Sequence, residues 1–484
     1  MSWFFERKQK VKPMFRMTVR CLLLVVICGA FPTPSTAADA YSLVEDYTNP
    51  REFAVTVEMK VTGKMQASAG DKKTAISMKL NAEAELDYDE RRLPPAGRDS
   101  RALRCVRYYR SAHANIQVDG QTTLPRLRQK NKLIVAEGQP NGVRYHSPER
   151  PLYFTELQLL GAPGDSLAVL VLLPSRDVEI GDTWKLDDWA AQFFTSLEAV
   201  EKGGIECTAK SVENDLLQVH FAGELTGAIY GAFTTVTVDG DFWFDVKNSY
   251  VTKMELKQSE KRTIGVVSQG LDVEAQVTLN RALKTGEKSL SDESLAGVPL
   301  EPNPANLLIA FDSNAWNVRF FHDRLWHLYK HERDAAAFRL VDHGSFLAQC
   351  KIAPLKSAKP GKHLSEDRFL KDIQTTLGEQ FQGVTSVEQV KGKAVNGKAV
   401  DGEEGRYIYR VETFGKIGDH EVTWIHYLIA AADGRQIALI FTVGKDVQEK
   451  FEGRDLQLAT SVEFLPVAAS AQQASEPAQA DRTK

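Results

Sequence analysis

The feature of this sequence that most constrains its fold is a set of long segments in which apolar and polar residues alternate. In residues 76–88 almost every second residue is apolar, and Ser, Lys, Asn and Glu stand between them. A period of two residues is typical of a β-strand with one buried and one solvated face. Residues 53–65, 230–246, 249–261 and 271–283 continue this pattern. Long alternating strands joined by short polar turns predict a curved antiparallel sheet.

The predicted fold class is α+β, and the chain is expected to begin, after residue 40, with a β-rich domain over residues 41–283. Lys247-Asn248 lies between two alternating segments and predicts a hairpin turn. Helices should be few in this domain. They are predicted at residues 152–160, 166–172 and 186–199.

Four apolar residues of the 76–88 segment share one face of its predicted strand: Ile76, Met78, Leu80 and Leu86. An apolar face of a sheet must be covered by other parts of the protein or must bind something. Two interpretations therefore stay open at this point. These residues are ordinary core, or they line a concave surface that holds a ligand.

A smaller second domain is predicted over residues 307–466, after a linker at residues 284–306. The linker segment lacks apolar periodicity and ends in a run with three prolines, a composition typical of connections between domains. Residues 467–484 are rich in Ala, Gln and Ser and are predicted to be a disordered tail.

The second domain is expected to combine strands with helices. A hairpin is predicted around His343-Gly344, and a helix is predicted from its N-cap residue Ser365 to Phe381, with an apolar residue at every fourth position. Later elements are predicted as strands at residues 384–391, 406–414, 421–431, 435–443 and 461–464, with a short helix within 446–458.

This order of elements resembles the PsbP-like α/β/α sandwich over about a third of the chain. The hairpin at 338–353, the helix at 365–381 and the paired segments 424–430 and 434–441 carry the resemblance. It implies a non-enzymatic binding or assembly domain and assigns no functional residue. Residues 173–184 look like a segment of uncharacterised exported bacterial proteins with large antiparallel sheets, which implies export.

Residues 1–40 have the order of a secretory signal peptide: a basic stretch, an apolar run and then small residues. Cleavage is expected after Ala37 or Ala40, and an uncleaved N-terminal anchor is the alternative. Polar residues interrupt every later apolar stretch, so no membrane span is expected after cleavage. The predicted location is the periplasm or the extracellular space.

Charge gives a further restriction on partners. The whole chain has a formal net charge of −4, and residues 1–40 contain six basic and two acidic residues, so 54 basic and 62 acidic residues remain after them, a formal net charge of −8. A mildly acidic chain argues against nucleic acid or an anionic membrane as the main partner.

Three cysteines follow the signal peptide: Cys105, Cys207 and Cys350. Their spacing matches no metal site, and they are too few for a disulfide framework. Whether Cys105 and Cys207 pair or are buried free thiols is left open, and Cys350 is predicted to be core.

Gly164-Asp165-Ser166-Leu167 matches the nucleophile block of the GDSL-type esterases. That family also needs a late Asp-x-x-His to supply the base, and the chain contains no such sequence. A serine without a base is a weak nucleophile. Ser166 is therefore predicted to lie in a loop that begins a helix, and the chain is expected not to be an enzyme.

Two other patterns point only weakly to a cofactor or a metal. Residues 392–399 have the spacing of a phosphate-binding loop, but Ala399 stands where Ser or Thr should hold magnesium. His327 and His331 lie about 13 Å apart if their segment is a strand, too far for one ion. His322 is near them in the sequence, and His343 and His420 are expected at solvated turns. No metal or cofactor site is predicted.

The aromatic residues divide into two groups. Trp424 and Tyr427 fall on opposite faces of a predicted strand whose neighbours are apolar, so both are expected in the core. The second group is expected to form a seam between domains or an exposed binding patch: Trp316, Phe320, Phe321 and Trp326.

The sequence thus predicts an exported non-catalytic bacterial protein that binds an apolar ligand or an envelope protein partner. It assigns no ligand-binding residues. The alternatives are a hydrolase with an unrecognised site, for example at Ser166, and a purely structural envelope component.

Overall fold

The computed structural model describes residues 39–45, 51–69, 72–94, 102–286, 288–390 and 406–466. The predicted signal peptide up to residue 38, the phosphate-loop-like segment 392–399 and the predicted tail lie outside the described residues. Within the described ranges, no helix is long and apolar enough to cross a membrane.

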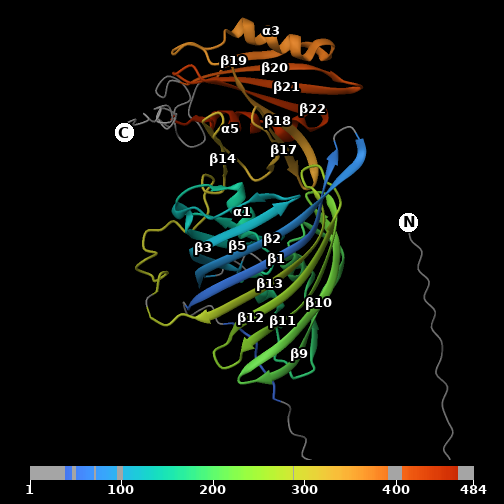
Figure 1. Ribbon diagram of the computed structural model, residues 1–484, viewed down its shortest axis with the longest axis vertical. Helices are drawn as coiled ribbons and strands as arrows, with labels where there is room; N and C mark the ends of the chain where they lie inside the picture. Colours follow the sequence, from blue (N-terminus) through green and yellow to red (C-terminus); the bar gives the residue numbers. More distant parts are fainter. Residues whose placement is uncertain are drawn as a thin grey trace, which may run out of the picture. The chain divides into compact units, whose positions relative to one another are not determined.

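One large antiparallel sheet of twelve strands forms much of the described chain (Figure 1). Its order is β6-β5-β3-β2-β1-β13-β12-β11-β10-β9-β8, with β4 paired to β3, so β6 and β8 are its two open ends. Figure 1 shows the long strands side by side in a curved layer. The strands are β1 Glu52–Ala69, β2 Lys72–Arg92, β3 Arg104–Val118, β4 Gln121–Thr123, β5 Leu133–Gln139, β6 Gly142–His146, β8 Thr183–Lys185, β9 Ala199–Glu213, β10 Leu216–Ile229, β11 Ala232–Asp245, β12 Tyr250–Arg262 and β13 Gly270–Leu283.

The predicted large antiparallel sheet is confirmed, and its alternating segments are its strands. In β2, Ala84, Leu86 and Tyr88 are buried, and the alternating residues Glu83 and Glu85 are exposed. The predicted turn at Lys247-Asn248 joins β11 to β12. The Asp245 carboxylate closes this turn by accepting the backbone N–H groups of both turn residues, at 3.0 and 2.8 Å.

Three short helices share a hydrophobic core with one face of this sheet, which we call the inner face. They are α1 Phe154–Leu160, the 3₁₀ helix η3 Ala168–Leu172 and α2 Asp188–Thr195. Each predicted helix is present but shorter than expected. The helix predicted at 186–199 ends at Thr195 because Ser196 adopts a left-handed conformation with φ of 55°.

A second, smaller sheet joins strands that are far apart in the sequence. Its order is β23-β15-β14-β7, where β7 is Leu152–Tyr153, β14 is Ile309–Ser313, β15 is Val318–His322 and β23 is Glu463–Phe464. In the preceding segment, 284–306, Leu290 is fully buried with Leu93, Val106 and Val135. The described part of this segment therefore packs against the large sheet.

The third sheet has seven strands within the described residues, in the order β16-β17-β18-β22-β21-β20-β19. Helix α3 packs on one face through Phe369 and Ile373, and α4 and α5 pack on the other through Phe451 and Leu458. Figure 1 shows α3 and α5 on opposite sides of this sheet. The elements are β16 Trp326–His331, β17 Ala336–Asp342, β18 Ser345–Leu355, α3 Glu366–Leu377, β19 Phe381–Gln389, β20 Tyr407–Ile417, β21 His420–Ala430, β22 Gln436–Gly444, α4 Gln448–Phe451 and α5 Arg454–Thr460.

Sequence reasoning placed most of these elements correctly. The hairpin around His343-Gly344 joins β17 to β18, and Trp424 and Tyr427 are both buried, as predicted. The predicted extent of helix α3 was wrong. It ends at Leu377 because Gly378 takes a positive φ of 53°, and Phe381 is the first residue of β19.

Candidate functional site

Ser166, the serine of the GDSL-like segment, lies in a buried network of charged side chains on the inner face. Its centre is Arg107 of β3. The guanidinium donates two hydrogen bonds to Asp165, both at 2.7 Å, and one to Glu90 at 3.0 Å. It also donates to the Ser166 hydroxyl at 2.9 Å. Arg107, Glu90 and Ser166 are essentially inaccessible to solvent.

The network continues along the inner face to β13. Arg281 pairs with both carboxylate oxygens of Glu45, at 2.9 and 2.8 Å, and approaches Glu90 at 3.5 Å. Arg92 lies close enough to influence Glu45 electrostatically. Among the described residues, the network therefore holds three arginines and three carboxylates, and its charges balance.

The arginines of the network lower the pKa values of two of its acids, Asp165 and Glu45. Burial alone would raise the pKa of Asp165, but the charge and hydrogen bonds of Arg107, with the Tyr145 hydroxyl, outweigh it and lower that pKa. The pKa of Glu45 is likewise lowered, because Arg281 outweighs its burial. Perturbed pKa values arise in structural ion networks as well as in active sites.

The surroundings of Ser166 are unlike those of an activated nucleophile. Its hydroxyl donates to Glu90 and accepts from Arg107, and the Tyr88 hydroxyl lies 3.0 Å away. These contacts occupy the oxygen, and no part of the residue is exposed. A hydrolytic nucleophile must reach both a substrate and a base. As predicted, Ser166 lies in a loop next to a short helix.

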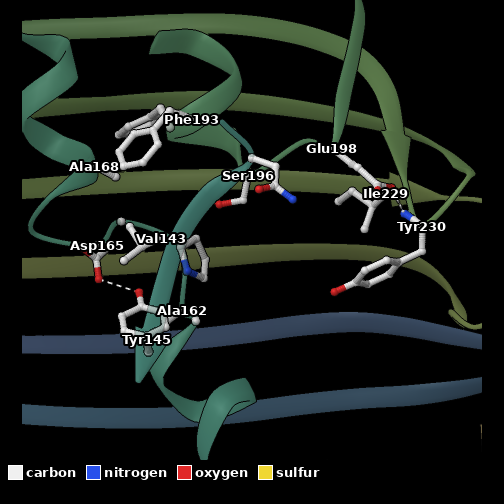
Figure 2. Close-up of a pocket in the computed structure, with 15 residues that line it drawn as sticks. Val143, Tyr145, Ala162, Asp165, Ala168, Phe193, Ser196, Glu198, Ile229 and Tyr230 are labelled. Atoms are coloured by element: carbon white, nitrogen blue, oxygen red, sulfur yellow. Dashed lines mark hydrogen bonds between the residues drawn. The ribbon is translucent and has the colours of Figure 1, made fainter. Parts of the chain in front are cut away.

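A cavity of about 200 Å³ adjoins this network (Figure 2). Tyr145 and Asp165 form its polar floor, joined by a hydrogen bond of 2.7 Å. In Figure 2, Asp165 and Tyr145 lie on the left, Glu198 and Tyr230 on the right, and Ser196 between them. The volume is below the ~300–1,000 Å³ usual for ligand pockets. This cavity is suited to a few ordered waters rather than to a large ligand.

The histidines in the 322–331 region lie among aromatic rings. His322 is buried, with Nδ1 2.8 Å from the Asp323 carbonyl oxygen. The His327 ring contacts Tyr230 at 4.5 Å, and the His331 ring contacts Phe311 at 5.1 Å between centroids. No group of three or more potential metal ligands occurs among the described residues. His343 and His420 are exposed, as predicted.

The other candidates are mostly core. Cys105, Cys207 and Cys350 are buried free thiols. Cys105 and Cys207 therefore do not form a disulfide in this structure. Of the aromatic group at the start of the second predicted domain, Trp316, Phe320 and Trp326 are buried, and Phe321 is half-buried, so they do not form an exposed patch.

Burial of histidine makes the protein sensitive to acid. Burial lowers the pKa of both His322 and His426 to about 4. In the unfolded chain histidine titrates near pH ~6.5. The unfolded chain therefore binds more protons between these pH values, and stability must fall as the pH decreases through this window.

We expect urea unfolding between about pH 7 and about pH 5 to show a falling free energy, with each ring contributing about 2 kcal/mol of the loss by pH 5. His426→Leu should flatten this pH dependence. His343→Ala, at an exposed turn, should leave it unchanged. The same slope in all three proteins would show that buried histidine does not cause the effect.

The inner face of the large sheet also carries an apolar surface beyond its core. The core includes Val57, Leu86 and Val277, but farther along these strands the inward side chains are only half-buried and belong to no core cluster. We call this set the distal patch. Its members are Val61, Met65, Met78, Leu80, Val118, Leu271 and Val273.

The strand register makes the distal patch continuous across β3, β2, β1 and β13. Leu80 is paired with Val118 and with Gly63, and Gly63 is paired with Val273. Met65 is likewise paired with Met78 on one side and with Leu271 on the other. Paired residues of neighbouring strands point to the same face of a sheet. The patch is therefore one surface.

Gly63 leaves the middle of the distal patch without a side chain. Its φ is 150°, and a Cβ atom built there would overlap the carbonyl oxygen of Asp272 on β13. A glycine in the interior of a strand often marks a bend or a close approach of another backbone. The surface between Leu80 and Val273 therefore lacks the bulk that alternation would otherwise place there.

The four residues singled out from the sequence have different surroundings. Leu86 is 4% exposed and belongs to the core, whereas Met78 and Leu80 are half-buried in the distal patch and Ile76 is 53% exposed. Each of the two open interpretations thus fits a different part of β2. Core packing describes Leu86, and an available apolar surface describes Met78 and Leu80.

No protein-family model matches the chain, and no curated protein matches it. Among solved structures, the translocator domain of the autotransporter NalP from Neisseria meningitidis aligns at 8% identity over 83% of this chain and 90% of that chain, with a TM-score of 0.13. The outer membrane protein OprD from Pseudomonas aeruginosa aligns at 8% identity over 84% and 95%, with a TM-score of 0.10. TM-scores this low establish no shared fold.

Proposed function

We propose that the protein is an exported, non-catalytic binding protein that holds an apolar ligand on the distal patch. The observation that carries this proposal is the half-buried apolar surface that continues past the core on the inner face. A contiguous apolar patch left in contact with water is typical of an interaction or ligand-binding site, whereas single exposed apolar residues are not. The α+β arrangement in two domains, with a PsbP-like unit for binding or assembly, and a periplasmic or extracellular location belong to the same proposal.

The edge of the distal patch suggests that the ligand has a polar end. Gln258, on β12, is paired with Ala275 and so faces inward beside the patch. Its side-chain oxygen is buried and has no hydrogen-bond partner among the described residues. A buried acceptor without a donor is costly, and a ligand hydroxyl or amide would satisfy it.

Two features count against the hydrolase alternative. The Ser166 hydroxyl is buried and fully engaged, and each acid of the adjoining network faces an arginine. A serine-dependent turnover that is lost in Ser166→Ala would contradict our proposal. An envelope protein that covers the distal patch remains the alternative occupant, and it would bind in place of a small ligand.

Binding of Nile red, a neutral apolar dye, tests the proposal. Leu80→Asp should weaken dye binding at least about tenfold, because it places a carboxylate in the apolar surface. Asn81→Asp introduces the same group one residue away on the opposite face and should leave binding unchanged. Circular dichroism should show both variants folded. Equal dye binding by both variants would contradict a site on the distal patch.

A further inference from the structure

We propose that a second cavity, lined by residues next to α1 and by strands β7, β14 and β15, binds an anionic group, phosphate or carboxylate, carried on an apolar body. Its volume is about 540 Å³, within the ~300–1,000 Å³ usual for small-molecule sites. It shares no lining residue with the cavity of Figure 2 or with the distal patch. The proposal is therefore independent of the apolar-ligand function.

The lining of this cavity, which we call the basic cavity, is positively charged. Four of its described lining residues are basic, Arg128, Lys130, Arg150 and Arg319, and one, Asp312, is acidic. Arg319 donates to both carboxylate oxygens of Asp312, at 2.7 and 2.8 Å, and so neutralises it. Arg128, Lys130 and Arg150 therefore give the cavity a positive charge, although the whole chain has a formal net charge of −4.

These three cations are available to a ligand. Among the residues that the structure describes, the one ion-pair contact of Arg150 is an exposed one of 4.0 Å with Glu149, which is outside the lining. Within the described residues, neither Arg128 nor Lys130 forms an ion pair, and both are exposed. An anion bound in the basic cavity would therefore gain attraction without first breaking a buried pair.

Tyr153 holds Arg128 in place and gives the cavity an apolar wall. The guanidinium carbon of Arg128 lies 3.1 Å from the centre of the Tyr153 ring. The N–H groups of a stacked guanidinium lie in its own plane, so stacking on the ring leaves them able to donate hydrogen bonds to a ligand. Tyr153 in turn donates to Asp312 at 3.0 Å. Pro151, Ala310 and Phe321 add further apolar lining.

Cations beside aromatic and apolar walls, one of them held by stacking on Tyr153, fit a ligand with an anionic head and an apolar or aromatic body. Inorganic phosphate would use only the cations, and a neutral aromatic would use only the walls. We therefore expect isothermal titration calorimetry with the purified protein to show binding of naphthyl phosphate, naphthoate or both. Inorganic phosphate and naphthol should each bind at least about tenfold more weakly than the better of these two. The tighter of the two anions identifies the head group.

Matched variants separate this site from general electrostatic attraction. Arg128→Gln should weaken binding of the better anion about tenfold. Arg126→Gln removes an exposed arginine two residues away that does not line the cavity, and it should change the affinity by less than about twofold. Binding of naphthol as tight as that of both anions, or an equal loss in the two variants, would overturn the proposal. Because Arg128 is exposed, its replacement should leave the unfolding midpoint unchanged.

Discussion

Replacing Arg107 by methionine is expected to lower the free energy of unfolding by about 3–5 kcal/mol. Methionine retains much of the length of the side chain, so the loss comes mainly from the charge. Without the guanidinium, Asp165 and Glu90 lose their ion pairs with Arg107 in a buried site. Leaving a buried charge without its partner costs more than the pair itself contributes.

Arg110→Met is the matched control, because Arg110 lies on the same strand and also contacts two carboxylates, Asp87 and Asp89. The Arg110 and Asp87 side chains are 38% and 37% exposed, so solvent replaces that pair, and the buried Asp89 keeps Lys284 and Ser289 as partners. We therefore expect a cost below about 1 kcal/mol. Chemical denaturation of the two variants measures the difference. Equal costs would contradict a structural role for the buried network. Adding Asp165→Asn to Arg107→Met should restore part of the loss.

The second large effect separates core from surface within one strand. Leu86→Ala is expected to cost about 2–5 kcal/mol, because Leu86 is buried in the main core. Leu80→Ala, six residues away on the same face of β2, should cost less than about half as much, because its side chain is already half-buried and outside the core clusters.

Thermal or urea unfolding of these two variants decides where the core ends. The sequence leaves Leu80 open between ordinary core and a ligand-holding surface, and its half-burial outside the core clusters favours the surface. If Leu80→Ala proves as costly as Leu86→Ala, the distal patch is ordinary core and leaves no apolar surface for a ligand. A small cost at Leu80 leaves the patch available.

Period-two alternation was enough to predict the large antiparallel sheet, because successive side chains of a strand point to opposite faces. It could not predict where along a strand the core stops. Leu80 and Leu86 have the same residue type and parity, but only Leu86 belongs to the core that the sheet shares with the helices of its inner face. That packing joins segments distant in sequence.

The buried charged network around Arg107 was not predicted from the sequence. The alternation of residues along β2 and β3 does place two of its members on the inward face. Glu90 follows Tyr88 on the inward face of β2, and Arg107 lies between Cys105 and Tyr109 on β3. Charged residues in phase with buried ones indicate paired buried charges. The partner Asp165 comes from a loop whose position the sequence does not determine. Helix α3 was overextended because the four-residue spacing continues to Phe381 across Gly378.

Photolabelling of the wild-type protein with a neutral long-chain alkyl diazirine tests the central claim most directly. The reagent inserts into the side chains that it contacts, and mass spectrometry of peptides identifies them. We predict labels on inward residues of the distal patch, such as Met65, Met78 and Leu80, that unlabelled long-chain alcohol displaces. Displaceable labelling confined to other surfaces, or labels on the outward residues Lys79 and Asn81 instead, would contradict a ligand site on the inner face.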